Sequence, residues 1–363
     1  MEQLNTTTYY SLGWDAFFGE LPESDSGVAA RVITENRGHF VVVNPSGELA
    51  AVLPRSLRKN PDQRPAVGDW VIIDFEGCSG VPTINRVLPR RSKLSRKVTG
   101  RQTREQVVAA NLDTVFIVSG LDGGRNLNLR RIERYLVFTW NSGASPVILL
   151  NKADLHEDNS GFVGEVEAIA GGVPVRAVSA SDGTGLDFVR GFLGVGRTVG
   201  FVGSSGVGKS ALTNALLGRD TQLTGDVRQG DLTGRHTTTR RQLLLIPDGG
   251  MIIDTPGMRE LQLWAKDEDL DDAFSDITAK SGQCRFLDCS HTVEPDCAVR
   301  EAVASGTIEA GRLESYLKLN REIEHLVRRE TYLGQQEEKA RWKNIGKMVK
   351  DLKKTNRKHG GTF

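Results

Sequence analysis

The sequence predicts a multidomain protein with a small β-barrel, a central α/β domain and a C-terminal metal-binding helical domain. Three observations predict this order. Short alternating strands come first, a regular alternation of strands and helices follows, and a cluster of cysteines lies near the C-terminal end. A length of 363 residues favours two or three domains. The expected boundaries are a polar extension at 1–24, the barrel at 25–104, the α/β domain at 105–264, and the helical domain with a basic tail at 265–363.

Bulk composition limits the class of protein. Hydrophobic residues make up 38% of the chain and charged residues 26%, which is typical of soluble globular proteins. No apolar run approaches the roughly 20 residues that span a bilayer. The N-terminus lacks the basic start and apolar core of a signal peptide. We therefore expect a cytoplasmic protein, and nothing in the sequence demands more than a monomer.

The barrel is predicted from five short apolar segments punctuated by turn residues between Val28 and Val87. They read AARVI, HFVVV, LAAVL, DWVIIDF and PTINRVL. Five strands in so few residues favour an OB-fold, with a generic or SH3-like barrel as the alternative. An OB-fold offers a groove for irregular nucleic acid. Its aromatics are sparse, so backbone and shape recognition is favoured over base reading.

Two basic segments indicate a polyanion partner, although the net charge is only +1. The C-terminal segment, 331–363, has nine Lys/Arg against three Asp/Glu, and a solvated charged face is its alternative interpretation. The other follows the last barrel strand and has no acidic residue. Its eight cations are Arg86, Arg90, Arg91, Lys93, Arg96, Lys97, Arg101 and Arg104.

From Leu112 onward, apolar strands alternate with helices, which predicts a doubly wound, mainly parallel sheet. The strands read LDTVFIVS, PVILL, PVRAVS, RTVGFVG, QLLLI and MIID. Helices are expected at Leu129–Thr139 and Ser210–Leu217.

A complete phosphate loop, GSSGVGKS, follows the strand RTVGFVG and opens a helix. Its glycines permit close backbone approach, and the helix N-terminus favours an anion. Lys209 is expected to reach the β- and γ-phosphates and Ser210 to bind Mg²⁺. The nucleotide-binding residues expected here are Gly203, Ser204, Ser205, Gly206, Val207, Gly208, Lys209, Ser210 and Ala211.

Base recognition is predicted at the segment Asn151-Lys152-Ala153-Asp154, which has the form NKxD of GTP-binding proteins. A carboxylate accepts from both N1–H and the exocyclic amine of guanine, so Asp154 selects GTP over ATP. Lys152 is expected to lie along the base. Ser179-Ala180 matches the short SA element, whose backbone contacts guanine O6.

NKxD precedes the phosphate loop here, whereas the reverse order is usual. The central domain is therefore predicted to be a circularly permuted P-loop GTPase domain, a rearrangement that keeps the contacts while moving the termini.

Two further segments complete the predicted site. Asp254-Thr-Pro-Gly257 has the form DxxG, with Asp254 holding Mg²⁺ through water and the Gly257 amide sensing the γ-phosphate. Upstream, the segment Gly234–Thr239 contains the switch threonine, for which we choose Thr238, with Thr237 and Thr239 as close alternatives.

The residue after DxxG is Met258, where Ras-like proteins have the glutamine that orients water. Either a partner completes the site or another residue positions the water. His236 is the candidate within the chain, and an exposed loop histidine is the alternative.

Cys284, Cys289, His291 and Cys297 provide three thiolates and one imidazole within fourteen residues. This Cys₃His set predicts one structural Zn²⁺ with no open position for water. Redox-active or incidental thiols are the alternative. The fourth cysteine, Cys78, is interpreted as incidental.

Together, NKAD, SA, GSSGVGKS, GRHTTT, DTPG and the cysteine cluster resemble the ribosome small subunit-dependent GTPase A family, from about Gly27 to the helical region after Cys297. Met258 agrees, because that family has a hydrophobic residue there. The resemblance implies a GTPase that binds small-subunit rRNA and acts in late maturation of the small ribosomal subunit, which stimulates it. An RNA-binding scaffold with GTP as a structural ligand is the second hypothesis. An ATP-dependent enzyme with a zinc module is the third.

Overall fold

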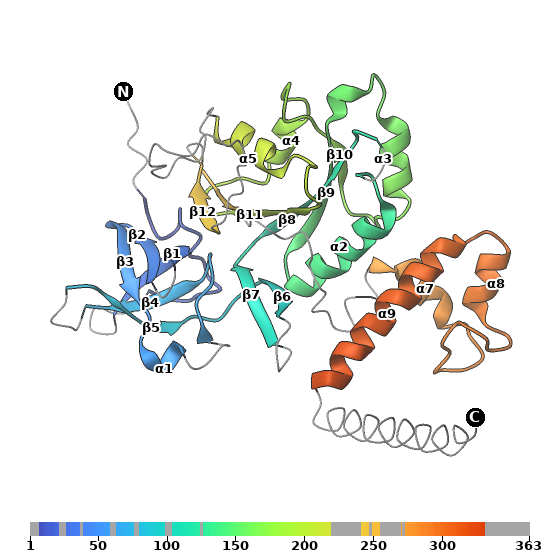
Figure 1. The fold of residues 1–363 in the computed structure, drawn as a ribbon, viewed down its shortest axis with the longest axis horizontal. Helices are drawn as coiled ribbons and strands as arrows, with labels where there is room; N and C mark the ends of the chain where they lie inside the picture. Colours follow the sequence, from blue (N-terminus) through green and yellow to red (C-terminus); the bar gives the residue numbers. More distant parts are fainter. Residues whose placement is uncertain are drawn as a thin grey trace, which may run out of the picture.

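The computed structural model places three parts side by side, with the α/β part in the middle (Figure 1). The barrel lies on one side of it and the C-terminal helices lie on the other. The model describes residues 7–21, 27–36, 39–58, 63–75, 80–98, 104–123, 126–218, 241–246, 249–254, 270 and 273–330.

The barrel is a closed sheet of five strands, as predicted. They are β1 (Val28–Asn36), β2 (His39–Asn44), β3 (Gly47–Val52), β4 (Trp70–Asp74) and β5 (Thr83–Val87). Their order is β1-β2-β3-β5-β4, and β4 pairs back onto β1. The short helix α1 (Arg55–Arg58) lies between β3 and β4. Alternate side chains fill the interior, among them the buried Phe40, Val42 and Ile84.

The N-terminal segment packs against the barrel. Leu12 is fully buried, and the ring of Trp14 lies edge-on to that of Trp70 with centroids 4.9 Å apart. The description of residues 1–24 as a polar extension missed these contacts, because the apolar side chains in this segment show no periodicity.

The central sheet contains six strands in the order β10-β9-β8-β11-β13-β12. They are β8 (Thr114–Gly120), β9 (Ser145–Asn151), β10 (Val175–Ala177), β11 (Thr198–Gly203), β12 (Gln242–Leu245) and β13 (Met251–Asp254). All neighbours are parallel except β12, which runs antiparallel to β13. After β8 the chain continues to β9 and β10 on one side of the β8–β11 pair, and after β11 it continues to β12 and β13 on the other side. A crevice outside the carboxyl ends of these two strands is where such sheets bind ligands.

Helices pack on this sheet. They are α2 (Leu129–Ser142), the 3₁₀ turn η3 (Ala153–Leu155), α3 (Ser160–Glu167), α4 (Leu186–Arg190) and α5 (Lys209–Leu217). The predicted helices correspond to α2 and α5. The sequence reading missed two short helices, α3, which contains Gly161 and Gly164, and α4, which lies between Gly185 and Gly191.

A strand pair joins the barrel to the central sheet. Thr34 of β1 pairs with Gln242 of β12, so the two parts form one continuous sheet of eleven strands. Nearby, the guanidinium of Arg31 is almost fully buried and donates to the carbonyls of Gly68 and Asn111 and to the hydroxyl of Thr198. Burial lowers the pKa of Arg31 to about 10. The joint is thus built from groups of both parts.

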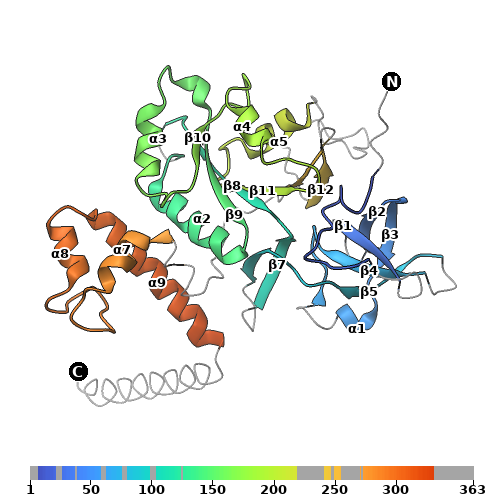
Figure 2. The ribbon, with the colours of Figure 1, turned by 180° about the vertical axis from the view of Figure 1, so that it is seen from behind.

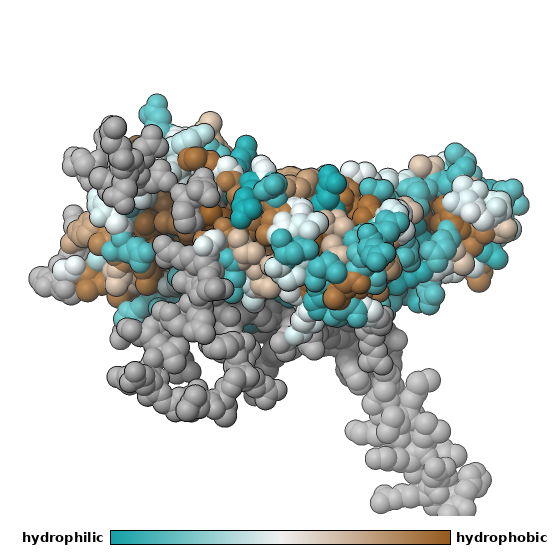
Figure 3. Space-filling view, turned by 90° about the horizontal axis from the view of Figure 1, so that it is seen from above, coloured by the Kyte–Doolittle hydropathy of each residue, from teal (hydrophilic) through white to brown (hydrophobic). Residues whose placement is uncertain are grey.

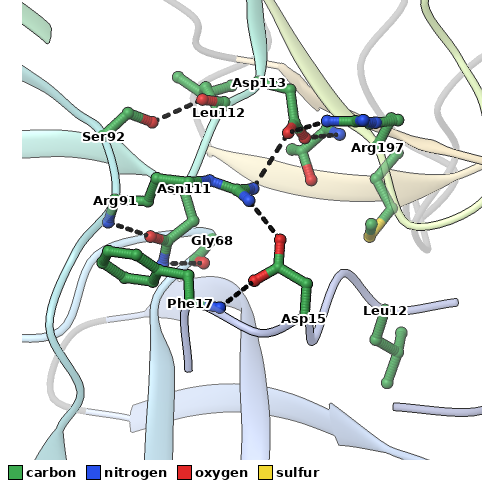
Figure 4. A network of polar contacts seen from close by, with 12 residues as sticks. Leu12, Asp15, Phe17, Gly68, Arg91, Ser92, Asn111, Leu112, Asp113 and Arg197 are labelled. Carbon is green, nitrogen blue, oxygen red and sulfur yellow. Dashed lines mark hydrogen bonds and ion pairs between the residues drawn. The ribbon is translucent and has the colours of Figure 1, made fainter. Parts of the chain in front are cut away.

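The basic segment after β5 is largely a hairpin that the sequence reading missed. Its strands are β6 (Lys93–Val98) and β7 (Arg104–Ala110). Arg91 forms ion pairs with Asp15 and Asp113, at 2.5 and 3.0 Å, and Arg197 shares Asp113 (Figure 4). The charge of Arg91 is thus paired with carboxylates of the protein, and the expectation that this arginine follows phosphates stays a prediction.

Two neighbours of Arg91 are paired in the same way. Arg90 binds both carboxylate oxygens of buried Asp69, at 2.8 and 2.7 Å, and Lys93 pairs with Glu105 at 2.8 Å. Arg86 and Arg96 have exposed side chains. Lys93 is exposed as well, so Arg86, Lys93 and Arg96 keep the surface position that a polyanion contact requires, with Lys93 paired to Glu105.

The C-terminal part contains α7 (Ser275–Ser281), α8 (Ala298–Ala304) and α9 (Ala310–Glu330). From behind, α9 runs beside α2 of the central part (Figure 2). Hydrophilic and apolar residues are interspersed on the face seen from above (Figure 3). No helix within the described ranges has the length and hydropathy needed to span a membrane.

Candidate nucleotide site and metal centre

The phosphate loop leaves β11 at Gly203 and ends at the first turn of α5. Gly203 has a positive φ of 145°, and a Cβ there would lie 2.3 Å from the carbonyl oxygen of Val118. Gly208 has a φ of 97° and precedes the first helical residue. Strand, loop and helix thus occur in the predicted order, with Ser210 and Ala211 exposed at the start of α5. This arrangement presents backbone amides and a helix N-terminus to an anion.

Lys209 and Asp254 lie at the same edge of the sheet. The Lys209 ammonium donates to the carbonyl oxygens of Gly203 and Ser204, at 2.8 and 2.6 Å. Asp254 ends β13, next to β11. Burial raises the pKa of Asp254, and the positive charge of Lys209 opposes that rise. A carboxylate in this position is suited to bind a cation such as Mg²⁺.

Asn151 connects three of the predicted segments. Its side-chain Nδ2 donates to the carbonyl of Val207, at 2.8 Å, and its Oδ1 accepts from the backbone N–H of Ala180, at 3.2 Å. The side chain is almost fully buried. The structure therefore brings NKAD, SA and the phosphate loop together, although they are far apart along the chain.

Asp154 presents an exposed carboxylate beside this junction. The hydroxyl of Ser179, a fully buried residue, donates to its Oδ1 at 2.6 Å and is the main reason that the pKa of Asp154 is lowered. The backbone N–H of Ala153 donates to the carbonyl of Val178. These bonds hold a charged carboxylate at the surface, where it can accept from a base.

Lys152 has a left-handed backbone conformation, with a φ of 68°, and its ammonium forms an ion pair with Asp122. The bond from Lys152 is the main cause of the lowered pKa of Asp122. Sequence reasoning missed Asp122. The signal was its place directly after β8, at the edge where the other segments converge.

A second missed residue is Arg131 of α2, which donates to the hydroxyl of Ser204 in the phosphate loop at 2.5 Å. No sequence motif marks it. Four sequence-predicted residues lie outside the described ranges, and their roles stay predictions. These are Gly257, Met258, His236 and Thr238, together with the alternatives Thr237 and Thr239.

The four predicted metal ligands converge in the C-terminal part. The ligand atoms of Cys284, Cys289, His291 and Cys297 all lie within 4.8 Å of one another. The Sγ atoms of Cys284 and Cys297 are 3.9 Å apart, and the His291 Nδ1 is 3.7 and 3.4 Å from them. A tetrahedral site with Zn–S bonds of about 2.3 Å places its sulfurs roughly 3.8 Å apart. The donor set therefore fits a closed tetrahedral metal site.

Comparisons with known proteins identify relatives over nearly the whole chain. A model of the RsgA GTPase family matches residues 87–264. A small ribosomal subunit biogenesis GTPase RsgA from Opitutus terrae is 44% identical over 93% of this chain and 96% of its own. A protein named small ribosomal subunit biogenesis GTPase RsgA 2, from Vibrio vulnificus, is 39% identical over 98% of both chains.

Two solved structures have the same architecture. The crystal structure of YjeQ from Thermotoga maritima is 30% identical, with a TM-score of 0.62, and the match covers 81% of this chain and 98% of that one. The structure of YloQ, a circularly permuted GTPase, is 22% identical, with a TM-score of 0.58 over 86% of this chain and 98% of that one. These matches confirm the predicted permuted fold.

Proposed function

The chain belongs to the RsgA GTPase family, and we propose that it is a GTPase that binds small-subunit rRNA and acts in late maturation of the small ribosomal subunit. It hydrolyses GTP to GDP and phosphate. The observation that carries the proposal is the junction at Asn151, where base-reading and phosphate-binding segments of a permuted chain meet. We further propose that it works in the cytoplasm as a monomer.

In this proposal Lys209 neutralises the β- and γ-phosphates, and the amides of Gly206 and Gly208 line the loop. Lys209 already lies beside the loop carbonyls and near Asp254, so its charge is positioned at that edge. Ser210 and Asp254 are the residues that would hold Mg²⁺, which when bound neutralises charge developing on the phosphates.

Guanine selection is assigned to Asp154, whose exposed carboxylate is oriented by Ser179. In this proposal Lys152, whose backbone is left-handed, extends toward the base, and Asp122 holds its ammonium. The backbone N–H of Ala180 is tied to Asn151, so the SA element and NKAD move as one unit.

The Cys₃His set is proposed to hold one structural Zn²⁺. Three sulfurs and one ring nitrogen complete a tetrahedron, which leaves no position for a catalytic water. Burial lowers the pKa of His291, which favours the neutral imidazole that binds metal.

Coupling to RNA is proposed to pass through the barrel. An OB-type barrel offers a groove, and Arg86 and Arg96 are exposed beside it. Its strand β1 pairs with β12, which lies between the predicted switch segment and Asp254 in the chain. If the subunit binds the GTP state more tightly, GTP must equally favour subunit binding, and hydrolysis then promotes release.

The closure of the site is assigned to Thr238 and Gly257. The positioning of the attacking water is assigned to His236, because Met258 stands where Ras-like proteins have the glutamine that does this. These assignments rest on the motifs alone. Their test is the loss of stimulated turnover in His236→Ala with unchanged GTP affinity.

The experiment for the whole proposal measures GTP turnover by the purified protein alone, with small ribosomal subunits and with large subunits. Specific stimulation by small subunits is expected. The variant Lys209→Ala should have no turnover while keeping the structural zinc. Turnover that is equally raised by both subunits, or by neither, would contradict the proposed partner. Negligible turnover throughout would instead favour the scaffold hypothesis.

A further inference from the structure

Helix α2 begins at the nucleotide edge of the sheet and directs a cation at the phosphate loop. The side chain of Asn128 caps the helix by accepting from the backbone N–H of Arg131, at 3.0 Å. The Arg131 guanidinium then donates to the hydroxyl of Ser204, at 2.5 Å. The cap therefore fixes the backbone from which this arginine reaches the loop.

Ser204 is held from two sides. Lys209 donates to its carbonyl oxygen, at 2.6 Å, while Arg131 binds its hydroxyl. Tyr135, one turn further along α2 and largely buried, also bonds the Ser204 side chain. The first residue of the loop after Gly203 thus has both its peptide and its side chain fixed by charged or buried groups.

Another face of α2 is clamped by α9. Glu133 is 1% exposed, and its Oε1 accepts from Arg312 at 3.0 Å. Arg312 also binds both carboxylate oxygens of Asp276, at 2.6 and 2.7 Å. A second ion pair joins Arg134 to Glu322 at 2.9 Å. The rotation and position of α2 therefore depend on the docking of the C-terminal helices (Figure 2).

We propose that Arg131 is a positioning residue that holds Ser204 for GTP hydrolysis, and that the α2–α9 ion pairs keep Arg131 in place. This inference rests on the proposed function, because it assigns hydrolysis to this loop. It makes the C-terminal helical part a determinant of the rate of GTP hydrolysis, a role separate from its metal site.

The physical reason is the geometry that phosphoryl transfer demands. Catalysis here is mostly positioning and charge stabilisation, so a small displacement of the loop costs rate. The hydrogen bond from Arg131 ends on Ser204 at the start of the loop, whereas the base is assigned to Asp154, which Ser179 orients. The anchoring of the base and of the distal loop should therefore survive its removal. Loss of Arg131 should consequently lower kcat more than it raises KM.

The test is a double-mutant cycle on basal turnover with Arg131→Ala, Ser204→Ala and the double variant. We expect each single change to lower kcat by about tenfold, with KM little changed, and the double variant to be no slower than the slower single one. Arg131→Lys, which keeps the charge, should recover part of the loss. An unchanged kcat in Arg131→Ala, or additive losses in the double variant, would overturn the role of Arg131. If Arg131→Ala does not fold, Ser204→Ala and Arg131→Lys carry the same comparison.

The dependence on α9 is tested with Glu133→Gln, which keeps the shape and removes the charge that Arg312 meets. A fall in kcat of roughly 2- to 30-fold is expected, the range for residues that couple distant groups, and it should vanish in the Arg131→Ala background. Glu165→Gln, on the exposed surface of α3, is the matched control. A kcat equal to that of the control would overturn the dependence. Both mutant cycles are measured on basal turnover, without ribosomal subunits. A lack of stimulation by subunits would therefore contradict only the proposed partner.

Discussion

The side-chain amide of Asn151 donates to the carbonyl oxygen of Val207 across 2.8 Å, joining two segments that lie 56 residues apart. In an unpermuted nucleotide domain the phosphate loop would precede this asparagine, whereas here it follows. The contact survives because permutation changes only where the chain is cut. The same side chain also accepts from Ala180, so one buried amide holds three parts of the site together.

Replacing Asn151 with alanine should weaken the binding of GTP and GDP alike. The change leaves the Val207 carbonyl and the Ala180 N–H without their partner, at a cost of roughly 1–3 kcal/mol for each group that stays buried. We expect the Kd for both nucleotides to rise at least tenfold in a calorimetric titration. Asn159→Ala is the control, since the side chain of Asn159 bonds only the Ala153 carbonyl among the contacts described. Equal affinities in the two variants would show that the junction does not organise the site.

Gly208→Ala should destabilise the nucleotide-free protein more than Gly206→Ala does. Both residues have a positive φ, so each alanine pays about 1–2 kcal/mol for its backbone conformation. A Cβ at Gly208 would also lie 2.1 Å from the Nδ2 of Asn151, whereas nothing lies within 4 Å of one at Gly206. The additional clash should cost about 1–3 kcal/mol in urea denaturation. Equal free energies of unfolding in the two variants would mean that the Asn151 side chain moves aside without cost.

Local patterns account for what the sequence predicted of the fold. The barrel strands are short apolar segments between turn residues, and the strands of the central sheet are continuous apolar runs, so each is visible in a short window. The pairing of Thr34 with Gln242, which unites the two sheets, joins residues about 200 positions apart and has no local signal. The N-terminal segment was missed for the same reason, since Leu12 is buried by distant groups.

The candidate site shows the same division. Motifs predicted Asp154, Lys209 and the four metal ligands, because the chemistry assigned to them needs fixed residue types at fixed spacing. Asp122 and Arg131 act through the positions of their neighbours, and only the folded sheet brings them to Lys152 and Ser204. The basic segment is a third case. Its charge was visible in the sequence, but the carboxylates that neutralise Arg90 and Arg91 were not.

Cys289→Ser should abolish metal binding while leaving nucleotide affinity unchanged. A serine hydroxyl replaces a thiolate that Zn²⁺ prefers, and the site has no spare ligand among the described residues. Metal analysis of the purified protein should find about one zinc per chain in the wild type and none in the variant. Cys78→Ser, at the fourth cysteine, should keep the metal. Full zinc content in Cys289→Ser would refute the assigned ligand set.

Arg31→Met should destabilise the joint between the barrel and the central sheet. The guanidinium is 1% exposed and satisfies the carbonyls of Gly68 and Asn111 and the hydroxyl of Thr198. Methionine fills similar space and leaves the Asn111 carbonyl and the Thr198 hydroxyl without this donor, at roughly 1–3 kcal/mol for each that stays buried, while the Gly68 carbonyl still accepts from the side-chain amide of Asn111. Faster amide exchange in β1 and β12, measured by mass spectrometry, is the expected result. Exchange that matches the wild type in both strands would show that other contacts suffice.

The most direct test of the guanine-nucleotide site is the base preference of Asp154→Asn. An asparagine presents a donor where the exocyclic amine of guanine also donates, whereas the same donor complements the carbonyl that xanthine has in place of that amine. We therefore predict that the variant loses GTP affinity and gains affinity for xanthosine triphosphate, as measured by competition titration against the wild type. Unchanged preference for GTP, with Asp154 replaced, would contradict the assignment of NKAD to the base and with it the permuted site.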